Sequence, residues 1–261
     1  MNIFPNLSWR FLRVWRRNFI VYRRIWKVNF LVPLFEPVLY ILAFGIGFRN
    51  LIGGIRYEGL NLSYTEFIAP ALIAIAVMWN SFFETTYSSF VRMIYQKTFD
   101  AMIATPLSLE EIILAEVIWG ATKAAAAAAI MLVVLGIFGF IAFPSGLLII
   151  PLAFLGGIAF GAIGLFFTGI VPSIDMFNLP IFLLMTPLFL LSGTFFPVSS
   201  LPPWAQKVSL AFPLYHVVEP TRLLALGRTE AVPLFSIGYL LIFSVVFLKL
   251  AMSSMRRRLI T

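Results

Sequence analysis

The chain has 261 residues, of which 61% are hydrophobic and only 11% are charged, and its formal net charge is +8 at pH 7. This is too few charged side chains to cover the surface of a soluble domain of this size. Most of the surface must therefore face lipid. The positive charge gathers beside apolar segments, which argues against nucleic-acid binding. The sequence therefore predicts an all-α integral membrane protein.

The N-terminal segment, residues 6–27, interleaves aromatic and aliphatic residues with arginines at helical spacing. We predict an amphipathic helix on the cytoplasmic membrane surface, within an N-terminal unit of residues 1–29. The alternative is a basic segment that only orients the protein in the membrane, because such a segment would contain the same residues. Because no small-x-small cleavage site follows the first apolar run at the usual distance, a signal peptide is not expected.

Six apolar segments follow, each long enough to cross a hydrocarbon core roughly 30 Å thick. They assign residues 30–255 to a six-span domain and leave residues 256–261 as a basic cytoplasmic tail. Lys and Arg gather before the first segment, between the second and third, and at the C-terminus, so the positive-inside rule places both termini in the cytoplasm. The predicted spans are Phe30–Phe48, Tyr64–Phe83, Ile113–Phe143, Leu147–Val171, Met176–Phe196 and Val232–Met252.

Acidic residues lie near or within these apolar runs. An unpaired carboxylate in lipid costs at least about 2.5 kcal/mol, so such residues usually face the protein interior or water. Glu36 lies between two prolines, where a kink in the first span would expose it to an internal cavity. Glu84 is expected to pair with a base such as Arg92 or Lys123, and Glu66 is expected to have a structural partner. The predicted intramembrane polar residues are Glu36, Glu84 and Asp175.

Small residues mark the third and fourth spans. Lys123–Met131 carries a row of alanines, and Gly157 and Gly161 form a Gly-x-x-x-Gly pair. Small side chains let helix backbones approach closely where lipid gives no hydrophobic drive for association. We expect packing within one subunit in preference to a contact between subunits.

The segment between the second and third spans carries most of the charge in the middle of the chain. The second span is expected to end near Phe83 and the third to begin no earlier than Leu109, so the residues between them emerge on the cytoplasmic side. Spacing predicts an amphipathic helix between Phe90 and Ala104, with Arg92, Gln96 and Asp100 near one face.

Stop and cap signals bound this helix. The Thr105-Pro106 pair ends it, because proline pushes the residue before it out of helical conformation. Ser108 caps the next helix, and Glu110 and Glu111 suit the positive end of its dipole. A short charged element of this kind would suit docking to a partner, and a solvated connecting loop is the alternative.

The segment Leu191–Glu230 is rich in both proline and large apolar residues. Proline forbids one continuous helix, while the apolar side chains resist full exposure to water. We predict that Leu201–Leu226 forms a broken, re-entrant hairpin in the outer leaflet. Its polar and aromatic residues either line an exit gate or anchor the hairpin at the interface, and anchoring is favoured. These residues are Trp204, Tyr215, His216 and Glu219.

Several chemistries are missing from the sequence. With one histidine and no cysteine, a metal site is not expected. No Gly-Lys pair occurs, so the chain has no Walker phosphate loop and is not expected to hydrolyse ATP. No other catalytic constellation was found, so the chain is predicted to be a transport subunit instead of an enzyme.

Two passages resemble the permease subunits of type-two ABC exporters, particularly the nodulation-factor exporter branch. They are FETTYSSFVRMIYQKTFDAMIATPLSLEEIILAEVIWGATK (Phe83–Lys123) and LLSGTFFPVSSLPPWAQKVSLAFPLYHVVEPTR (Leu190–Arg222). The resemblance implies a multi-pass inner-membrane permease that pairs with itself and joins two copies of a cytoplasmic ATPase, which binds ATP and Mg. It also implies that the loop between the second and third spans docks into that ATPase. The residues assigned to this coupling are Arg92, Gln96, Lys97, Asp100, Thr105 and Pro106.

The resemblance further implies export of an amphipathic substrate, such as a lipid-linked or acylated saccharide, through a pathway between two permeases. A drug or lipid exporter of the same family is the alternative. An integral-membrane transferase would use Glu36, Glu84 or Asp175 as base or metal ligand, but these acids are scattered along the sequence. A third alternative is an assembly factor without transport.

Overall fold

The computed structural model describes residues 7–47 and 53–260. The α-helices are α1 Phe11–Arg24, α2 Trp26–Tyr40, α3 Tyr64–Phe83, α4 Thr98–Ile103, α5 Leu109–Ile137, α6 Ile149–Ile170, α7 Asn178–Pro180, α8 Thr186–Leu191, α9 Pro203–Leu210, α10 Tyr215–Ala225 and α11 Leu234–Leu259. The π-helical turns are η1 Ile41–Ile46, η2 Glu84–Ser88, η3 Val91–Tyr95 and η6 Ile181–Met185. The 3-10 turns are η4 Ser145–Leu148, η5 Ile174–Phe177, η7 Val198–Ser200 and η8 Thr229–Ala231. The strands are β1 Ile55–Tyr57 and β2 Leu60–Leu62.

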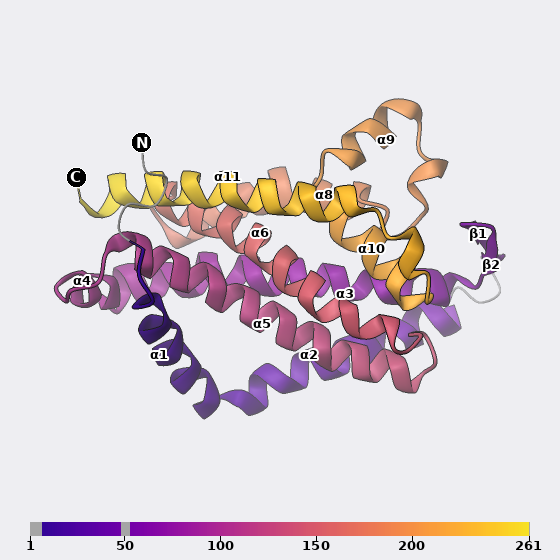
Figure 1. Cartoon of the computed structure of the whole chain (residues 1–261), viewed down its shortest axis with the longest axis horizontal. Coiled ribbons are helices and arrows are strands. Elements are labelled where there is room, and N and C mark those ends of the chain that lie inside the picture. Colours follow the sequence, from indigo (N-terminus) through magenta and orange to yellow (C-terminus); the bar gives the residue numbers. More distant parts are fainter. Residues whose placement is uncertain (1–6, 48–52, 261) are drawn as a thin grey trace.

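The long helices run side by side along the longest axis of the molecule (Figure 1). The start of α1, the helix α4 and the end of α11 lie at one end of this bundle, and β1, β2 and α9 lie at the other (Figure 1). Helix α3 is the most enclosed, since every residue from Phe67 to Met78 is buried. Apolar side chains of α11 and η6 remain exposed on the outside, as expected of helices that face lipid.

Five helical segments of the described residues are long and apolar enough to cross a membrane. They are Tyr64–Tyr95, Leu109–Ile137, Ser145–Ile170, Ile174–Leu191 and Leu234–Leu259. The first predicted span, Phe30–Phe48, corresponds to α2 and η1, whose apolar part, Pro33–Ala43, is shorter than the other five. Phe48 itself lies outside the described residues.

The predicted end of the second span at Phe83 was wrong. The turns η2 and η3 continue the helix to Tyr95, so the bases and acids between them lie within the bundle. Charged residues usually mark the end of a span, but Glu84 and Arg92 neutralise each other inside the protein and therefore do not require water. The predicted helix between Phe90 and Ala104 is instead two pieces, η3 and α4.

Other span boundaries also moved, and the fifth span ends at Leu191 instead of Phe196. The third span ends at Ile137 instead of Phe143, and the left-handed backbone of Gly139, with φ of 81°, follows its end. The last helix continues to Leu259, so the arginines 256–258 lie in its last turn. Cationic side chains are stable there because they face the negative end of the helix dipole.

Side-chain caps fix where two of the long helices begin. Ser108 caps α5 as predicted: its hydroxyl accepts from the backbone N–H of Glu111, whose carboxylate accepts from the backbone N–H of Ser108. Ser63 and Glu66 form the same capping box at the start of α3, which confirms a structural partner for Glu66.

Glycines let α6 approach its neighbours closely. A Cβ atom on Gly157 would lie 2.7 Å from the Cα atom of Ala121 in α5, and one on Gly161 would lie 2.9 Å from the hydroxyl of Ser81 in α3. The Gly-x-x-x-Gly pair therefore packs within one chain, as predicted. The tight helix contacts hold α3, α5 and α6 as the central group of the bundle.

A short β-hairpin at the far end of the bundle was not predicted. Its strands pair antiparallel, with Tyr57 opposite Leu60, and Glu58 and Gly59 supply the left-handed turn. With three residues each, these strands are too short to give a clear alternating pattern in the sequence.

Candidate functional site

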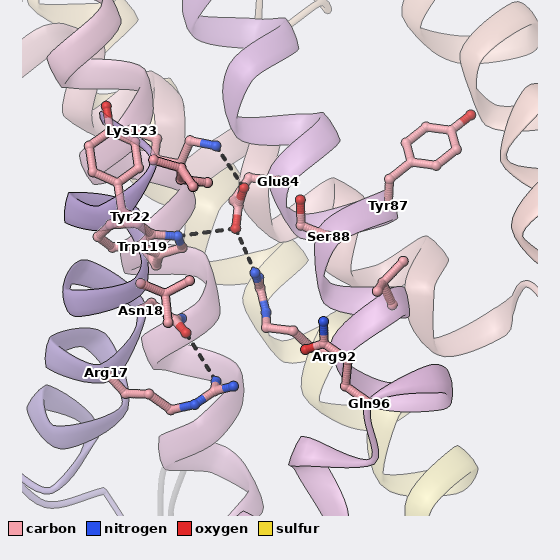
Figure 2. A pocket seen from close by; sticks show the side chains of 13 residues that line it. Arg17, Asn18, Tyr22, Glu84, Tyr87, Ser88, Arg92, Gln96, Trp119 and Lys123 are labelled. Carbon is pink, nitrogen blue, oxygen red and sulfur yellow. Dashed lines mark hydrogen bonds and ion pairs between the residues drawn. The ribbon is translucent and has the colours of Figure 1, made fainter. Parts of the chain in front are cut away.

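Glu84 is the centre of a buried charge network between the segment that follows α3 and helix α5 (Figure 2). Its carboxylate accepts from Arg92 Nη1 and from Lys123 Nζ, each at 2.8 Å, and from Trp119 Nε1 at 3.1 Å. The Glu84 side chain is 5% exposed, so the two bases are needed to compensate its charge. The predicted pairing of Glu84 with Arg92 or Lys123 is confirmed, and both bases take part.

Glu116 forms the second half of the network and was not predicted as a site residue. It is fully buried in α5 and accepts from Ser89 Oγ at 2.7 Å, from Asn18 Nδ2 at 3.0 Å and from the guanidinium of Arg92. Arg92 therefore bridges both carboxylates. Two acids and two bases balance in charge, which lets the cluster remain ionised away from water.

Helical spacing explains why these side chains meet. Glu116, Trp119 and Lys123 recur at intervals of three and four residues, so they project from one face of α5. On the opposite wall, the π-helical turns η2 and η3 widen the helix between Glu84 and Arg92 and bring both side chains to the same face.

Helix α1 closes one side of the network and lies against α5. Asn18 reaches Glu116, Trp15 Nε1 donates to Thr122 Oγ1 at 3.0 Å, and Arg10 Nη1 donates to the carbonyl oxygen of Pro106 at 2.7 Å. The segment is a helix, as predicted. Its polar contacts face α5 and the loop before it, while Trp9, Leu12, Phe19 and Ile20 remain exposed.

Two neighbouring cavities adjoin the network. The first has a volume of about 480 Å³ and is bounded by α1, by the segment that follows α3, and by α5. Figure 2 shows Arg17, Asn18 and Tyr22 on the helix that faces Glu84. The second, of about 510 Å³, is lined in part by Glu36 of α2. The residues shared by both cavities are Glu84, Tyr87, Ser88 and Lys123.

The residues predicted to couple to an ATPase separate into two groups. Arg92 belongs to the buried network. Lys97 adopts the left-handed backbone conformation between η3 and α4, with φ of 53°, and lies 3.8 Å from Asp100 in an exposed ion pair. The remaining residues of this group are also exposed on the surface around α4, namely Gln96, Thr105 and Pro106. The predicted common face of Arg92 and Asp100 is therefore absent.

The four residues predicted at an outer gate have different surroundings. Trp204 is 66% exposed on α9, and Tyr215 is half-buried. His216 is buried, with Nδ1 3.0 Å from Ser236 Oγ and Nε2 2.9 Å from the carbonyl oxygen of Leu210. Glu219 accepts from the hydroxyl of Tyr57 in β1 at 2.6 Å. Asp175, the third predicted intramembrane acid, is exposed in η5 at the start of its helix.

Arg222 is a further buried cation that sequence analysis did not single out. Its Nη2 donates to the carbonyl oxygen of Gly193 at 2.8 Å and its Nε to that of Phe67 at 3.1 Å, and its guanidinium lies 3.8 Å from the centre of the Phe67 ring. It also pairs with Glu219 at 3.4 Å. Burial lowers the pKa of Arg222. The only sequence signal was the three-residue spacing from Glu219.

The helices and their buried charges define an all-α integral membrane protein. The family is shown by comparison with known proteins: this chain belongs to the ABC-2 type transporter family, whose profile matches residues 10–226. The predicted resemblance to permeases of type-two ABC exporters is thereby confirmed.

Individual relatives match nearly the whole chain. Nodulation protein J of Sinorhizobium fredii is 34% identical over 259 residues, which cover 99% of this chain and 97% of the relative. Nodulation protein J of Rhizobium leguminosarum bv. trifolii is 36% identical over 98% of this chain and 96% of its own length. The inner membrane transport permease YadH of Escherichia coli K12 is 26% identical over 97% of each chain.

Proposed function

We propose that this chain is the membrane-spanning permease subunit of an ATP-driven exporter. Its substrate is an amphipathic molecule, such as a lipid-linked or acylated saccharide, moved out of the cytoplasm or the inner leaflet. The observation that carries the proposal is the similarity to Nodulation protein J along nearly the whole chain. Polar cavities beside a buried charge network, inside otherwise apolar helices, are consistent with passage of a partly polar molecule.

The permease crosses the inner membrane six times, with α2 and η1 as the first span and both termini in the cytoplasm. Two observations support this topology. The start of α1 and the end of α11 lie at the same end of the bundle (Figure 1), and arginines concentrate there. A short first span of this kind is accommodated by local thinning of the bilayer.

The chain works with a separate cytoplasmic ATPase. Two ATPase copies join two copies of the permease, and ATP and Mg bind to the ATPase. Helix α4 and its flanks form the contact, because Lys97 and Asp100 are exposed at the end of the bundle where α1 starts and α11 ends (Figure 1). Arg92 transmits movement of this region to the network, since its carbonyl oxygen accepts from Thr98 Oγ1 at 2.8 Å at the start of α4.

At the opposite end, α9 and α10 form the re-entrant outer hairpin, and α1 lies at the cytoplasmic membrane interface. The exposed Trp204 anchors α9 at the membrane surface, whereas His216 and Glu219 hold the hairpin to its neighbours. These contacts support an anchoring role for the four residues in preference to a gate.

Deletion of the gene provides the direct test of the substrate. We expect mass spectrometry of surface and medium extracts to show loss of an acylated or lipid-linked saccharide, with recovery when the wild-type gene is restored. An unchanged set of surface and exported molecules, together with impaired uptake of a small nutrient, would contradict the proposal.

A further inference from the structure

One face of the second membrane-spanning segment carries two parallel rows of side chains. Trp79, Phe83 and Tyr87 recur every four residues and form an aromatic row. The residue after each of these in the sequence is polar, and together they form a polar row of Asn80, Glu84 and Ser88. Residues four apart on a helix lie one above the other, so the two rows run side by side along the helix. All six side chains line the second cavity.

The aromatic row is a continuous surface. The rings of Trp79 and Phe83 are stacked, with centroids 4.9 Å apart and planes at 18°, and the Phe83 and Tyr87 centroids are 5.8 Å apart. Phe83 is 40% exposed, and the other two are partly exposed. Lipid contact alone would explain these rings if their neighbours were apolar, but the neighbouring row is polar.

The facing wall of the cavity adds a free carboxylate, and the polar row itself contains a free hydroxyl. Within the part of the chain that the structure describes, the half-buried carboxylate of Glu36 has no ion-pair or hydrogen-bond partner, and neither does the hydroxyl of Ser88. Lys123 is already paired with Glu84. The free carboxylate of Glu36 can accept hydrogen bonds, and the free hydroxyl of Ser88 can accept or donate them. The charge of Lys123 is already neutralised by Glu84.

These features fit the chemistry of a sugar. A pyranose ring presents an apolar C–H face that packs on an aromatic ring, and hydroxyls at its edge that bond to carboxylates, amides and other hydroxyls. An acyl chain would leave the carboxylate of Glu36 and the hydroxyl of Ser88 without partners, at an energetic cost. An anionic ligand is disfavoured here, because it would be repelled by Glu36 and because the charge of Lys123 is already neutralised by Glu84.

We propose that the second cavity binds the saccharide part of the substrate, with Trp79 and Phe83 against the sugar face and Glu36, Asn80 and Ser88 on its hydroxyls. The volume of about 510 Å³ lies within the range of roughly 300–1,000 Å³ for small-ligand pockets. The site deepens the proposed export function and rests on it. It also gives a role to Glu36, which has no ion-pair partner among the described residues.

Binding to the full chain in lipid nanodiscs tests the site. Calorimetric titration with cellotetraose and chitotetraose, in the absence of glycoside detergents, measures affinity for wild type, Trp79→Ala, Glu36→Gln and Trp204→Ala. We expect Trp79→Ala to bind about tenfold more weakly, because it loses an aromatic contact, and Trp79→Phe to keep much of the affinity. Glu36→Gln should also bind more weakly. Trp204→Ala, which removes an exposed tryptophan at the far end, should bind as wild type does.

Other outcomes would overturn the site. Absence of saccharide binding by wild type would do so, as would equal affinities in wild type, Trp79→Ala and Glu36→Gln. Binding of tetradecanoate, but of neither saccharide, that Trp79→Ala weakens would assign the cavity to an acyl chain. ATP-driven export, measured separately with the ATPase present, distinguishes the two proposals. Undiminished export of the acylated saccharide by Trp79→Ala overturns only the site, whereas no export by wild type contradicts the function itself.

Discussion

Individual charged residues in this protein are stable in the bundle because each has specific partners. Glu84 and Glu116 share Arg92, and Lys123 completes the balance. Such a network is expensive to break, since removal of one partner leaves an uncompensated charge in a medium of low dielectric constant. The network therefore orders α1, the η2–η3 segment and α5 relative to one another.

Loss of the Glu116 charge should destabilise the fold. Glu116→Gln keeps the shape of the side chain but leaves Arg92 with one carboxylate, so we expect a loss on the order of 3 kcal/mol in the free energy of unfolding. Glu110→Gln, in the first turn of the same helix, is the matched control and should change stability little. Thermal unfolding in detergent measures both, and equal melting temperatures would refute a structural role for the network.

His216 makes stability depend on pH in a defined window. Its Nε2 faces a carbonyl oxygen and so carries the hydrogen, while Nδ1 accepts from Ser236. Burial lowers the pKa of His216 in the folded state below the ordinary value of about 6.5. The unfolded chain takes up a proton first as pH falls, so the stabilisation present above about pH 6.5 is lost towards the lowered folded pKa.

We therefore expect the melting temperature of the wild type to decrease when the pH is lowered from 7.5 to 5.5. The sole histidine of the chain is His216, so His216→Gln should remove the histidine contribution to this dependence. An identical pH dependence in both proteins would show that His216 keeps its ordinary pKa.

At the scale of elements, the junction between η3 and α4 connects the charged surface with the buried network. Lys97 in its left-handed conformation sets the angle of α4, and the ion pair with Asp100 is exposed. An exposed ion pair contributes little to stability, on the order of 0.5 kcal/mol, so changes here should leave the fold intact. This makes the element suitable for testing contact with the ATPase.

Charge reversal at Lys97 or Asp100, made separately, should uncouple ATP hydrolysis from export. The reason is that each side chain would meet a like charge on the partner, while the permease itself remains folded. Both ATPase rate and export are measured in proteoliposomes, and Lys207→Glu at the opposite end serves as the control. Normal coupling in both variants would show that the segment is a plain connecting loop.

Some elements were predictable from sequence, and others were not. The Ser108 cap and the Glu84 pairing follow from local spacing and from the cost of a buried charge, so both were predicted correctly. The extension of the second span to Tyr95 was missed because Glu116, which neutralises Arg92 in this segment, is distant from it in the sequence. Arg222 was missed for the same reason, since its carbonyl partners come from two other segments.

At the scale of the whole molecule, the topology can be tested by single cysteines because the chain contains none. Thr105→Cys next to α4 and Lys207→Cys on α9 are both exposed positions at opposite ends of the bundle. We expect a membrane-impermeant maleimide to label residue 207 in intact spheroplasts and residue 105 only after lysis. The reverse pattern would invert the orientation, and labelling of both sites in intact spheroplasts would contradict the proposed topology.

Reconstituted transport tests the central claim, export by a permease that depends on a separate ATPase. Proteoliposomes containing this chain alone, the ATPase alone, or both receive ATP and Mg on the ATPase side, and movement of the acylated saccharide to the opposite side is measured. The account predicts uphill movement only when both proteins and ATP are present. ATP hydrolysis or uphill movement by this chain alone would contradict it, as would no movement by the assembled complex.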